Sequence, residues 1–383
     1  MRQVEIAQKI EFEHMPVLDG LRGIAVLLVI WHHLDLLLPG IRLYVPGGFL
    51  GVDVFFVLSG FLITSILLKE FDRHDRISLS NFYIRRTLRL VPGLWLFLVT
   101  LFVFGGSLLP EREAVTIYSY NNFVYAATYL MNWHRVAGAE AGNLNHTWSL
   151  AIEEQFYIIW SLILVIVLPR LTKRAVAIGT ASIVALLIAQ RAIRTAVGAD
   201  ADVLYYSTDT RIDALLIGCV ASMAYCWRLL PPEWTGAILD RLCLATLIIG
   251  AASLFLFDHQ SSGLFYGGIS VFSISIAVLI LWLVTRSGSG IHRVLELSPL
   301  RWLGNISYGL YLWHYVCFEF ARMTFDSAFV QVLAAFSMSL GISAISFYFL
   351  EKPLLSLKSR FISVSHPRAA SPGRSQEADP VLG

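Results

Sequence analysis

Ionisable side chains stand inside several apolar stretches of this 383-residue sequence, and their spacing indicates where chemistry is possible. His33 follows Arg22 by eleven residues within the stretch 17–38. A helix turns about 100° and rises about 1.5 Å per residue, so the two share one face to within about 20° and lie about 16 Å apart. Histidine changes charge near neutral pH, so His33 is a candidate general base. The alternative is a core histidine bonded to a carboxylate; His32, about 100° round the helix, is expected to face elsewhere.

Two carboxylates are candidate partners of His33. Ser149, Glu153 and Tyr157 are spaced four residues apart, so they share one helix face, and Ser149 and Tyr157 are candidate acceptor or structural polar groups. A carboxylate at bilayer depth is costly, and we interpret Glu153 as catalytic rather than as a structural hydrogen-bond partner. Asp53 opens a neighbouring apolar segment, where a helix N-terminus stabilises a carboxylate. For Asp53, a capping role and a catalytic role are equally good interpretations.

The remaining polar candidates are basic or lie at helix ends. Arg86 and Arg89 are spaced i, i+3, so both guanidinium groups face one side, as the capture of a phosphate requires. The alternative is that they only mark the cytoplasmic side of a membrane protein. Arg211, Asp213 and His314 are better explained as interhelical ion pairs or polar clamps.

The composition places these residues in a membrane. The chain is 56% hydrophobic and 15% charged, with a mean hydropathy of +0.66, whereas a soluble protein is about 25% charged. A net charge of +2 and the absence of zinc-finger spacing exclude a nucleic-acid binder, and the four cysteines read as core residues. The sequence predicts an all-α, polytopic protein of about ten membrane helices. The expected segments are 17–38, 47–68, 90–106, 148–169, 175–193, 212–227, 242–257, 264–285, 303–320 and 328–350.

Positive charge predicts the orientation of these helices. With the N-terminus inside, the cytoplasmic segments hold 21 of the 29 Lys and Arg residues and the external ones hold 7. Both termini are therefore expected in the cytoplasm, with the arginine pair at the cytoplasmic side and the His33 region toward the outside. Residues 1–357 are expected to form one membrane domain, and 358–383 a disordered cytoplasmic tail. The first apolar run lacks a cleavage site, so we expect it to remain in the protein.

The same residues fall in motifs that resemble the integral-membrane acyltransferase family 3, over about residues 14–355. The motifs occur in order: Leu18-Asp19-Gly20-Leu21-Arg22-Gly23 with His33, Gly51 to Gly60, Arg85-Arg86-x-x-Arg89-x-x-Pro92, Trp148-Ser149-Leu150-x-x-Glu153-x-x-Phe156-Tyr157, Arg211-x-Asp213, Gly304-x-x-Ser307-Tyr308 with Tyr311 and His314, and Glu351-Lys352-Pro353. The ordered set is far more specific than any one of them.

The resemblance implies a bacterial cell-membrane enzyme that moves an acyl group, usually acetyl, from cytoplasmic acyl-CoA to a hydroxyl. The acceptor is a cell-surface or exported carbohydrate, or a glycosylated small molecule such as a macrolide. The family implies a catalytic role for His33 and essential roles for Arg22, Arg86, Arg89 and Glu153, with the arginines on the donor side. It implies acyl-CoA as a co-substrate, with no resident cofactor or metal.

The sequence departs from the family pattern in two ways. His32 stands beside His33, where the family has an apolar residue, so either imidazole is a candidate. We also expect the chain to lack the extra C-terminal extracytoplasmic domain of some members, so that helices and external loops bind the acceptor. His33 would act as a general base, oriented by Glu153 or Asp53, or as a nucleophile that forms an acyl-imidazole.

Two other classes of function compete with acyl transfer. The same His, Asp and Glu side chains would serve a proton-coupled transporter, although no internal repeat of the kind that transporters carry is evident in the sequence. A non-catalytic sensor or scaffold would tolerate the loss of His33. Release of CoA by the purified protein separates the enzyme from both.

The orientation is testable with reporters. A reporter fused after Gly383 should be active only in the cytoplasm, and one inserted near Gly138 only outside, because of the asymmetry in positive charge. If each reporter were active only on the side opposite to the expected one, the orientation would be wrong and every candidate residue would lie on the other side of the membrane.

Overall fold

A computed structural model describes residues 15–37, 45–108, 120–230 and 237–357, and in these ranges every regular element is a helix. Ten long helices coincide with the ten predicted segments, which confirms the all-α class. Their bounds are α2 (Pro16–His32), α3 (Gly51–His74), α4 (Leu79–Leu108), α8 (Trp148–Val167), α9 (Lys173–Ala196), α11 (Thr208–Cys226), α12 (Ala237–Leu256), α13 (Ile269–Thr285), α15 (Ser298–Thr324) and α16 (Ala328–Ser346). The expected tail 358–383 lies outside the described residues.

The chain is a polytopic membrane protein. Within the described residues, seven helical segments are long and apolar enough to cross a bilayer. The other three long helices, α2, α11 and α15, are shorter or carry more polar side chains, among them the candidates Arg22, Arg211 and His314.

The helices alternate in direction, so the bundle has two distinct ends. Lys173 at the start of α9 pairs with Asp72 near the end of α3, 2.8 Å apart, which places these helix termini at one end. Arg194 near the end of α9 pairs with Asp209 at the start of α11, also 2.8 Å apart, at the other. We name the first the basic end, because α4 begins there and carries Arg86 and Arg89 in its first turns. We name the second the histidine end, because α2 ends there at His32.

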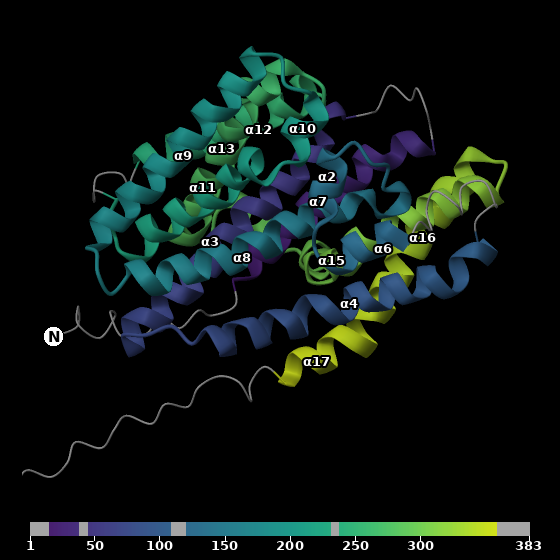
Figure 1. Ribbon diagram of the computed structural model, residues 1–383, viewed down its shortest axis with the longest axis horizontal. Helices are drawn as coiled ribbons and strands as arrows, with labels where there is room; N and C mark the ends of the chain where they lie inside the picture. The colour runs from purple at the N-terminus through teal and green to yellow at the C-terminus, as the bar shows by residue number, and fades with distance from the viewer. Residues whose placement is uncertain (1–14, 38–44, 109–119, 231–236, 358–383) are drawn as a thin grey trace, which may run out of the picture.

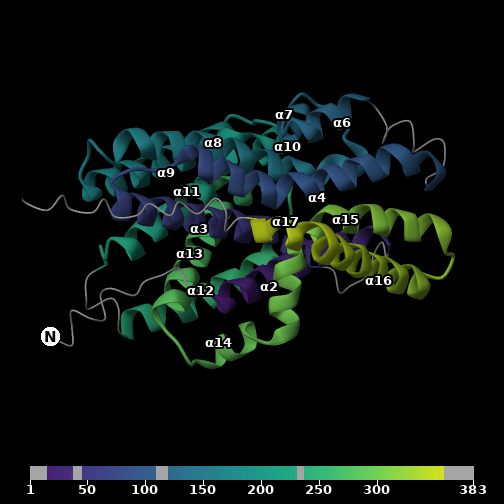
Figure 2. The same cartoon turned by 90° about the horizontal axis from the view of Figure 1, so that it is seen from below.

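The long helices form layers, and short helices lie at the margins of the bundle. Figure 1 shows α9, α12 and α13 on one side of the bundle and α4 with α17 (Lys352–Ser356) on the opposite side, with α2, α3 and α8 between them. Figure 2 shows short helices at opposite margins, with α14 (Gly290–Leu295) at one and α6 (Tyr120–Ala127) and α7 (Met131–Val136) at the other. The remaining short elements are η2 (His33–Leu36), η3 (Pro46–Leu50), η4 (Gly142–Thr147), α10 (Ala201–Tyr206), η6 (Leu264–Gly268) and η7 (Phe347–Glu351).

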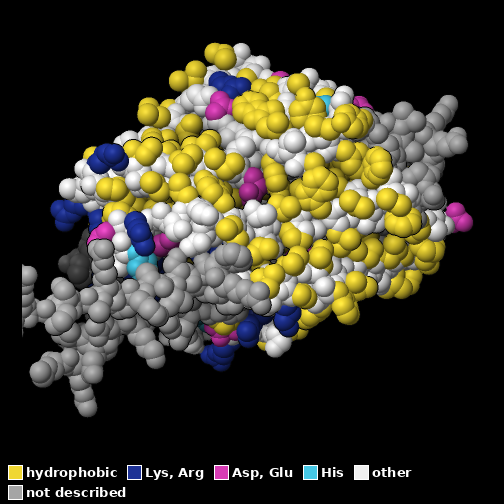
Figure 3. Space-filling view, turned by 60° about the horizontal axis from the view of Figure 1, so that its bottom comes forward, with side chains coloured by type: hydrophobic (Ala, Val, Ile, Leu, Met, Phe, Trp, Pro, Cys, Tyr) yellow, Lys and Arg dark blue, Asp and Glu magenta, His cyan; other side chains and the backbone are white. Residues whose placement is uncertain are grey.

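The outer surface is apolar, as a lipid-facing surface must be. Large side chains such as Phe102, Phe329 and Phe349 are more than 70% exposed. Figure 3 shows hydrophobic side chains over most of the described surface of one face, with most charged groups toward its margins. Helices satisfy most of their backbone groups internally, as the hydrocarbon of a bilayer requires.

Glycines permit the closest helix crossings. A Cβ at Gly60 of α3 would lie 1.9 Å from the carbonyl oxygen of Leu215 in α11, and one at Gly218 would lie 2.1 Å from that of Val57. Gly304 of α15 meets the backbone of Asp19 in α2 equally closely, at 1.9 Å. Small residues let backbones approach in this way in membrane bundles. The crossings hold α3 against α11 and α2 against α15, the helices that carry Arg22, Asp53, Arg211, Asp213 and His314.

Among the helix boundaries that differ from the prediction, two affect candidate residues. Helix α4 begins at Leu79 rather than near residue 90, because α3 closes at Asp75 (φ 54°) in a tight turn and Ser78 N–H donates to Glu70 at 2.8 Å. The arginines therefore lie within a helix rather than ahead of one. Helix α2 ends at His32 instead of residue 38, and a 3₁₀ turn begins at His33.

We predict that Gly60→Ala lowers the free energy of unfolding of the purified protein by about 1–3 kcal/mol, and with it the melting temperature, because the added methyl group overpacks the α3–α11 crossing. Gly179→Ala in α9 is the matched control, since a Cβ there meets nothing within 4 Å and alanine favours a helix. Thermal unfolding in detergent checks both. Equal melting temperatures for the two variants would show that the close crossing does not constrain the bundle.

Candidate active site

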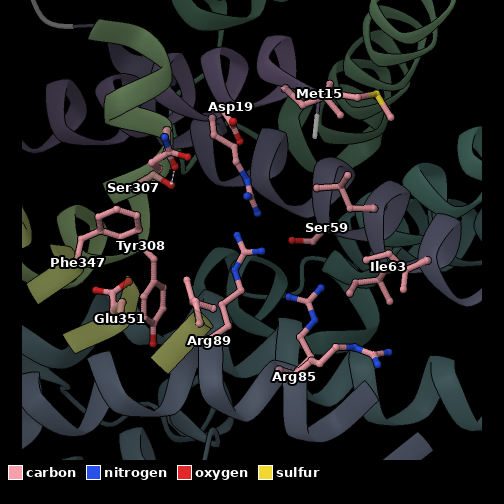
Figure 4. Close-up of a pocket in the computed structure, with 18 of the residues that line it drawn as sticks. Met15, Asp19, Ser59, Ile63, Arg85, Arg89, Ser307, Tyr308, Phe347 and Glu351 are labelled. Atoms are coloured by element: carbon pink, nitrogen blue, oxygen red, sulfur yellow. Dashed lines mark hydrogen bonds between the residues drawn. The ribbon is translucent and has the colours of Figure 1, made fainter. Parts of the chain in front are cut away.

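The largest of the cavities described here, about 390 Å³, opens among α2, α3, α4, α15 and η7 at the basic end. We call it the basic cavity. Its described lining carries four arginines and two carboxylates, namely Arg22, Arg85, Arg86, Arg89, Asp19 and Glu351. Figure 4 shows Arg89 pointing toward the centre, with Ser59 on one side and Tyr308 and Glu351 on the other. The excess of positive charge suits an anionic group such as a phosphate.

Neighbouring side chains hold the arginines of α4 in place. Arg85 lies 3.5 Å from Glu70 of α3, across the turn between the two helices. The guanidinium group of Arg86 lies over the ring of Tyr157 in α8, 4.3 Å from the centroid, which is a cation–π contact. Arg86 and Arg89 both line the basic cavity, as their i, i+3 spacing predicted.

A second, narrow cavity of about 70 Å³ continues inward from the first. It shares Arg22, Arg86 and Arg89 with the basic cavity, and its wall also contains Ser149, Glu153 and Tyr157. These three side chains of α8 share one face, as predicted. Glu153 accepts hydrogen bonds from Ser59 at 3.1 Å and from Tyr157 at 3.0 Å, so its carboxylate is held beside the arginines.

A third cavity, of about 160 Å³, lies at the histidine end and contains His33, and we call it the histidine cavity. It shares Val52 and Tyr311 with the narrow cavity. Tyr311 donates to the carbonyl of His146 at 2.6 Å and bonds the Ser149 hydroxyl at 2.7 Å. The three cavities therefore follow one another from the arginines to His33, with Tyr311 at the boundary between the second and third.

The hydrogen bonds of His33 define its tautomer. Its Nδ1 lies 2.8 Å from the carbonyl oxygen of Val29, which can only accept, so this nitrogen carries the proton and Nε2 remains a free base. The Nε2 of His314 approaches the same Nδ1 at 3.4 Å, while His314 Nδ1 lies 2.7 Å from the carbonyl of Tyr311. His33 is thus oriented by a backbone carbonyl and a second imidazole.

The expectation that a carboxylate orients His33 is not met in the described structure. Asp53 forms an ion pair with Arg211, whose Nη2 lies 3.0 Å from both carboxylate oxygens, and both side chains are fully buried. Glu153 bonds Ser59 and Tyr157 instead. Asp53 lines none of the three cavities.

A second buried ion pair joins Asp213 to Arg191, 2.9 Å apart, with Ser270 bonded to both. Interhelical ion pairs were expected at Arg211 and Asp213, and the structure contains them. The seven external charges counted from the sequence include Arg191 and Arg211, and the side chains of both are fully buried in the bundle. The guanidinium of Arg191 also bonds the carbonyls of Phe265 and Thr210, so α9, α11 and α13 meet at one side chain.

One expectation about the histidines changes. His32 was expected to face away from His33, yet both line the histidine cavity, because the chain leaves the α-helical path after His32. His314 was expected to be a structural polar group, and its buried contact with His33 behind the cavity wall agrees with that expectation. The sequence reasoning missed His146, whose position three residues before Ser149 was the available signal, and Tyr311, which stood only within a motif.

No grouping of His, Cys, Asp and Glu in the described residues has the arrangement of a metal site. The three cavities contribute a base, a set of hydroxyl groups and a cluster of guanidinium groups. Such a set, placed across a membrane bundle, is consistent with a membrane-embedded group-transfer protein.

Comparison with known proteins agrees with this class. A family model described as an acyltransferase domain matches residues 15–349, and the chain belongs to this family, acyltransferase family 3. No solved structure matches the chain.

Three relatives illustrate the similarity. The chain is 33% identical to "Peptidoglycan O-acetyltransferase OatA" of Listeria monocytogenes, over 89% of this chain and 56% of that protein. It is 33% identical to "Putative peptidoglycan O-acetyltransferase YrhL" of Bacillus subtilis, over 89% of this chain and 55% of that protein. It is 32% identical to "Putative O-acetyltransferase SAS0844" of Staphylococcus aureus, over 90% of this chain and 58% of that protein. The chain thus spans little more than half the length of these relatives.

Proposed function

We propose that this protein transfers an acyl group, acetyl by preference, from acyl-CoA to a hydroxyl of a cell-surface carbohydrate. The observation that carries the proposal is the series of three cavities, which begins at an arginine cluster and ends at a histidine with a free Nε2. The names of the relatives support O-acetyl transfer and a peptidoglycan-like acceptor. A glycosylated small molecule is the second acceptor class that fits the same chemistry.

The donor would enter at the basic end. CoA carries phosphates, and the guanidinium groups of Arg22, Arg86 and Arg89 offer forked donors of the geometry that phosphates prefer. The narrow cavity then leads the pantetheine arm and its thioester toward Tyr311. This placement puts the donor on the cytoplasmic side that the charge asymmetry predicts, in the cell membrane of a bacterium.

The transfer step follows from the tautomer of His33. Its Nε2 accepts the proton of the acceptor hydroxyl as the oxygen attacks the thioester carbonyl carbon. The carbon–sulfur bond breaks, the imidazolium returns its proton to the departing thiolate, and the products are an ester and free CoA. The Val29 carbonyl keeps the ring oriented, and His314 accepts from the same N–H at longer range. Transient acylation of Nε2 is the nucleophilic variant of this step.

We predict that His33→Ala abolishes acyl transfer, with a loss of at least about 10²-fold, because a hydroxyl is a poor nucleophile without a base. Membrane insertion should be unchanged. CoA release by the purified protein and the O-acetyl content of the cell-surface glycan are the two measurements. His32→Ala, in the same cavity, should have the smaller effect; equal rates for His33→Ala and the unmodified protein would remove His33 from the mechanism.

Arg89→Lys should raise the KM for acyl-CoA about tenfold and leave much of kcat, because lysine keeps the charge but loses the forked donors that hold a phosphate. Steady-state kinetics with varied acetyl-CoA checks this, and Arg86→Lys should behave similarly.

Arg170→Lys is the matched control at the same end of the bundle, since Arg170 is exposed and bonds the carbonyl of Ile166 in its own turn. The donor site would have to be sought elsewhere if the KM for acetyl-CoA were unchanged in both Arg86→Lys and Arg89→Lys.

A further inference from the structure

The histidine cavity contains a buried polar group that the mechanism does not use. His146 is 4% exposed and lines this cavity; its ring lies near the backbone carbonyls of Asn143 and Leu312, but neither ring nitrogen forms a hydrogen bond of normal geometry. A buried imidazole without well-formed hydrogen bonds is costly, and most buried polar groups are satisfied. The ring is positioned by Phe97, Tyr311 and Tyr315, whose centroids lie 5.8, 5.4 and 5.9 Å away.

A second polar group beside it is also incompletely satisfied. The amide nitrogen of Asn145 donates to the Tyr206 hydroxyl at 3.4 Å, while its carbonyl oxygen is buried and has no partner. Asn145 and His146 are consecutive in η4, and both line the histidine cavity with His33. Together they offer a donor and an acceptor to a molecule in this space.

The rest of the cavity wall is aromatic and uncharged. Apart from histidines, its described lining includes Phe49, Trp148, Tyr205, Tyr206, Tyr311 and Tyr315, with no Asp, Glu, Lys or Arg. Aromatic faces pack well against the C–H groups of a ring whose hydroxyls point elsewhere. A charged group brought here would lose its hydration and would meet no Asp, Glu, Lys or Arg among the described lining residues, which is unfavourable.

We infer that the histidine cavity is an acceptor subsite for one uncharged sugar ring, hydrogen-bonded by His146 and Asn145 with its hydroxyl toward His33. This inference rests on the proposed function and adds two statements to it. The sugar that receives the acyl group is neutral, and Asn145 and His146 bind the acceptor without affecting the donor. Its binding would satisfy the polar atoms that the protein leaves without partners.

The first experiment uses three trisaccharides of matched size with the purified protein and acetyl-CoA. They are triacetylchitotriose, which is neutral, its de-N-acetylated form, which is cationic, and trigalacturonate, which is anionic. Mass spectrometry of the sugar and CoA release are measured together. The neutral sugar should be acetylated at least about tenfold faster than either charged one, since each unpaired charge in an apolar site is strongly disfavoured.

The second experiment separates acceptor from donor binding. His146→Phe keeps the ring and removes both nitrogens, so the KM for triacetylchitotriose should rise about tenfold while the KM for acetyl-CoA stays within about twofold. His146→Gln retains a donor and an acceptor and should show a smaller rise; it also serves if the phenylalanine variant fails to fold. His134→Gln is the control, because His134 lies outside the cavity and bonds Asn122 at 2.8 Å.

A third variant changes the selectivity. Asn145→Asp places a negative charge in the subsite with almost no change in shape, so the rate ratio of the cationic to the neutral trisaccharide should increase at least about tenfold. A ratio of rates remains measurable even where total activity falls.

The outcomes are distinguishable. Equal rates for neutral and charged sugars, acetyl-CoA turnover that no sugar accelerates, or an unchanged acceptor KM in both His146 variants would overturn the subsite. A protein that never releases CoA and leaves glycan acetylation unchanged would overturn the proposed function itself.

Discussion

Charge buried in the bundle must be paired, and the architecture depends on how this is done. Arg211 bonds Asp53 across α11 and α3, and Arg191 bonds Asp213 across α9 and α11. All four side chains are fully buried. Breaking one such pair by removing a partner costs about 3–5 kcal/mol, so each pair specifies which helices are neighbours. The glycine contacts between α3 and α11 then allow these helices to come close enough for the pairing.

The Asp53–Arg211 pair also supports the site without entering it. The Arg211 guanidinium lies 5.5 Å from the ring of Trp148 and 4.9 Å from that of Tyr205, and both rings line the histidine cavity. A rigid, neutralised pair beneath these rings holds the aromatic wall in place. Asp53, for which a catalytic role was one of two equal interpretations, thus helps to maintain the shape of the cavity in which His33 is proposed to act.

The arginines at the basic end, in contrast, are not each paired with a carboxylate of their own. Arg22, Arg86 and Arg89 share the narrow cavity with a single described carboxylate, Glu153. This excess of positive charge is unfavourable, and an anion such as the proposed acyl-CoA donor would reduce it. Tyr311 and Val52 separate this charged region from the uncharged histidine cavity, and the proposed donor and acceptor meet at that boundary.

The sequence by itself determined the helical class, the ten segments and the sets of residues that share one helix face, because these depend on hydropathy and on the 3.6-residue period. Arg86 with Arg89, and Ser149 with Glu153 and Tyr157, line the cavities as that period predicted. Only the tertiary structure decided which side chains the candidate residues contact. His33 meets His314 across 281 positions of the chain and Asp53 meets Arg211 across 158, and no local pattern encodes such contacts. They arise from which helices pack together, and that is decided by close glycine crossings and by the cost of leaving a buried charge unpaired.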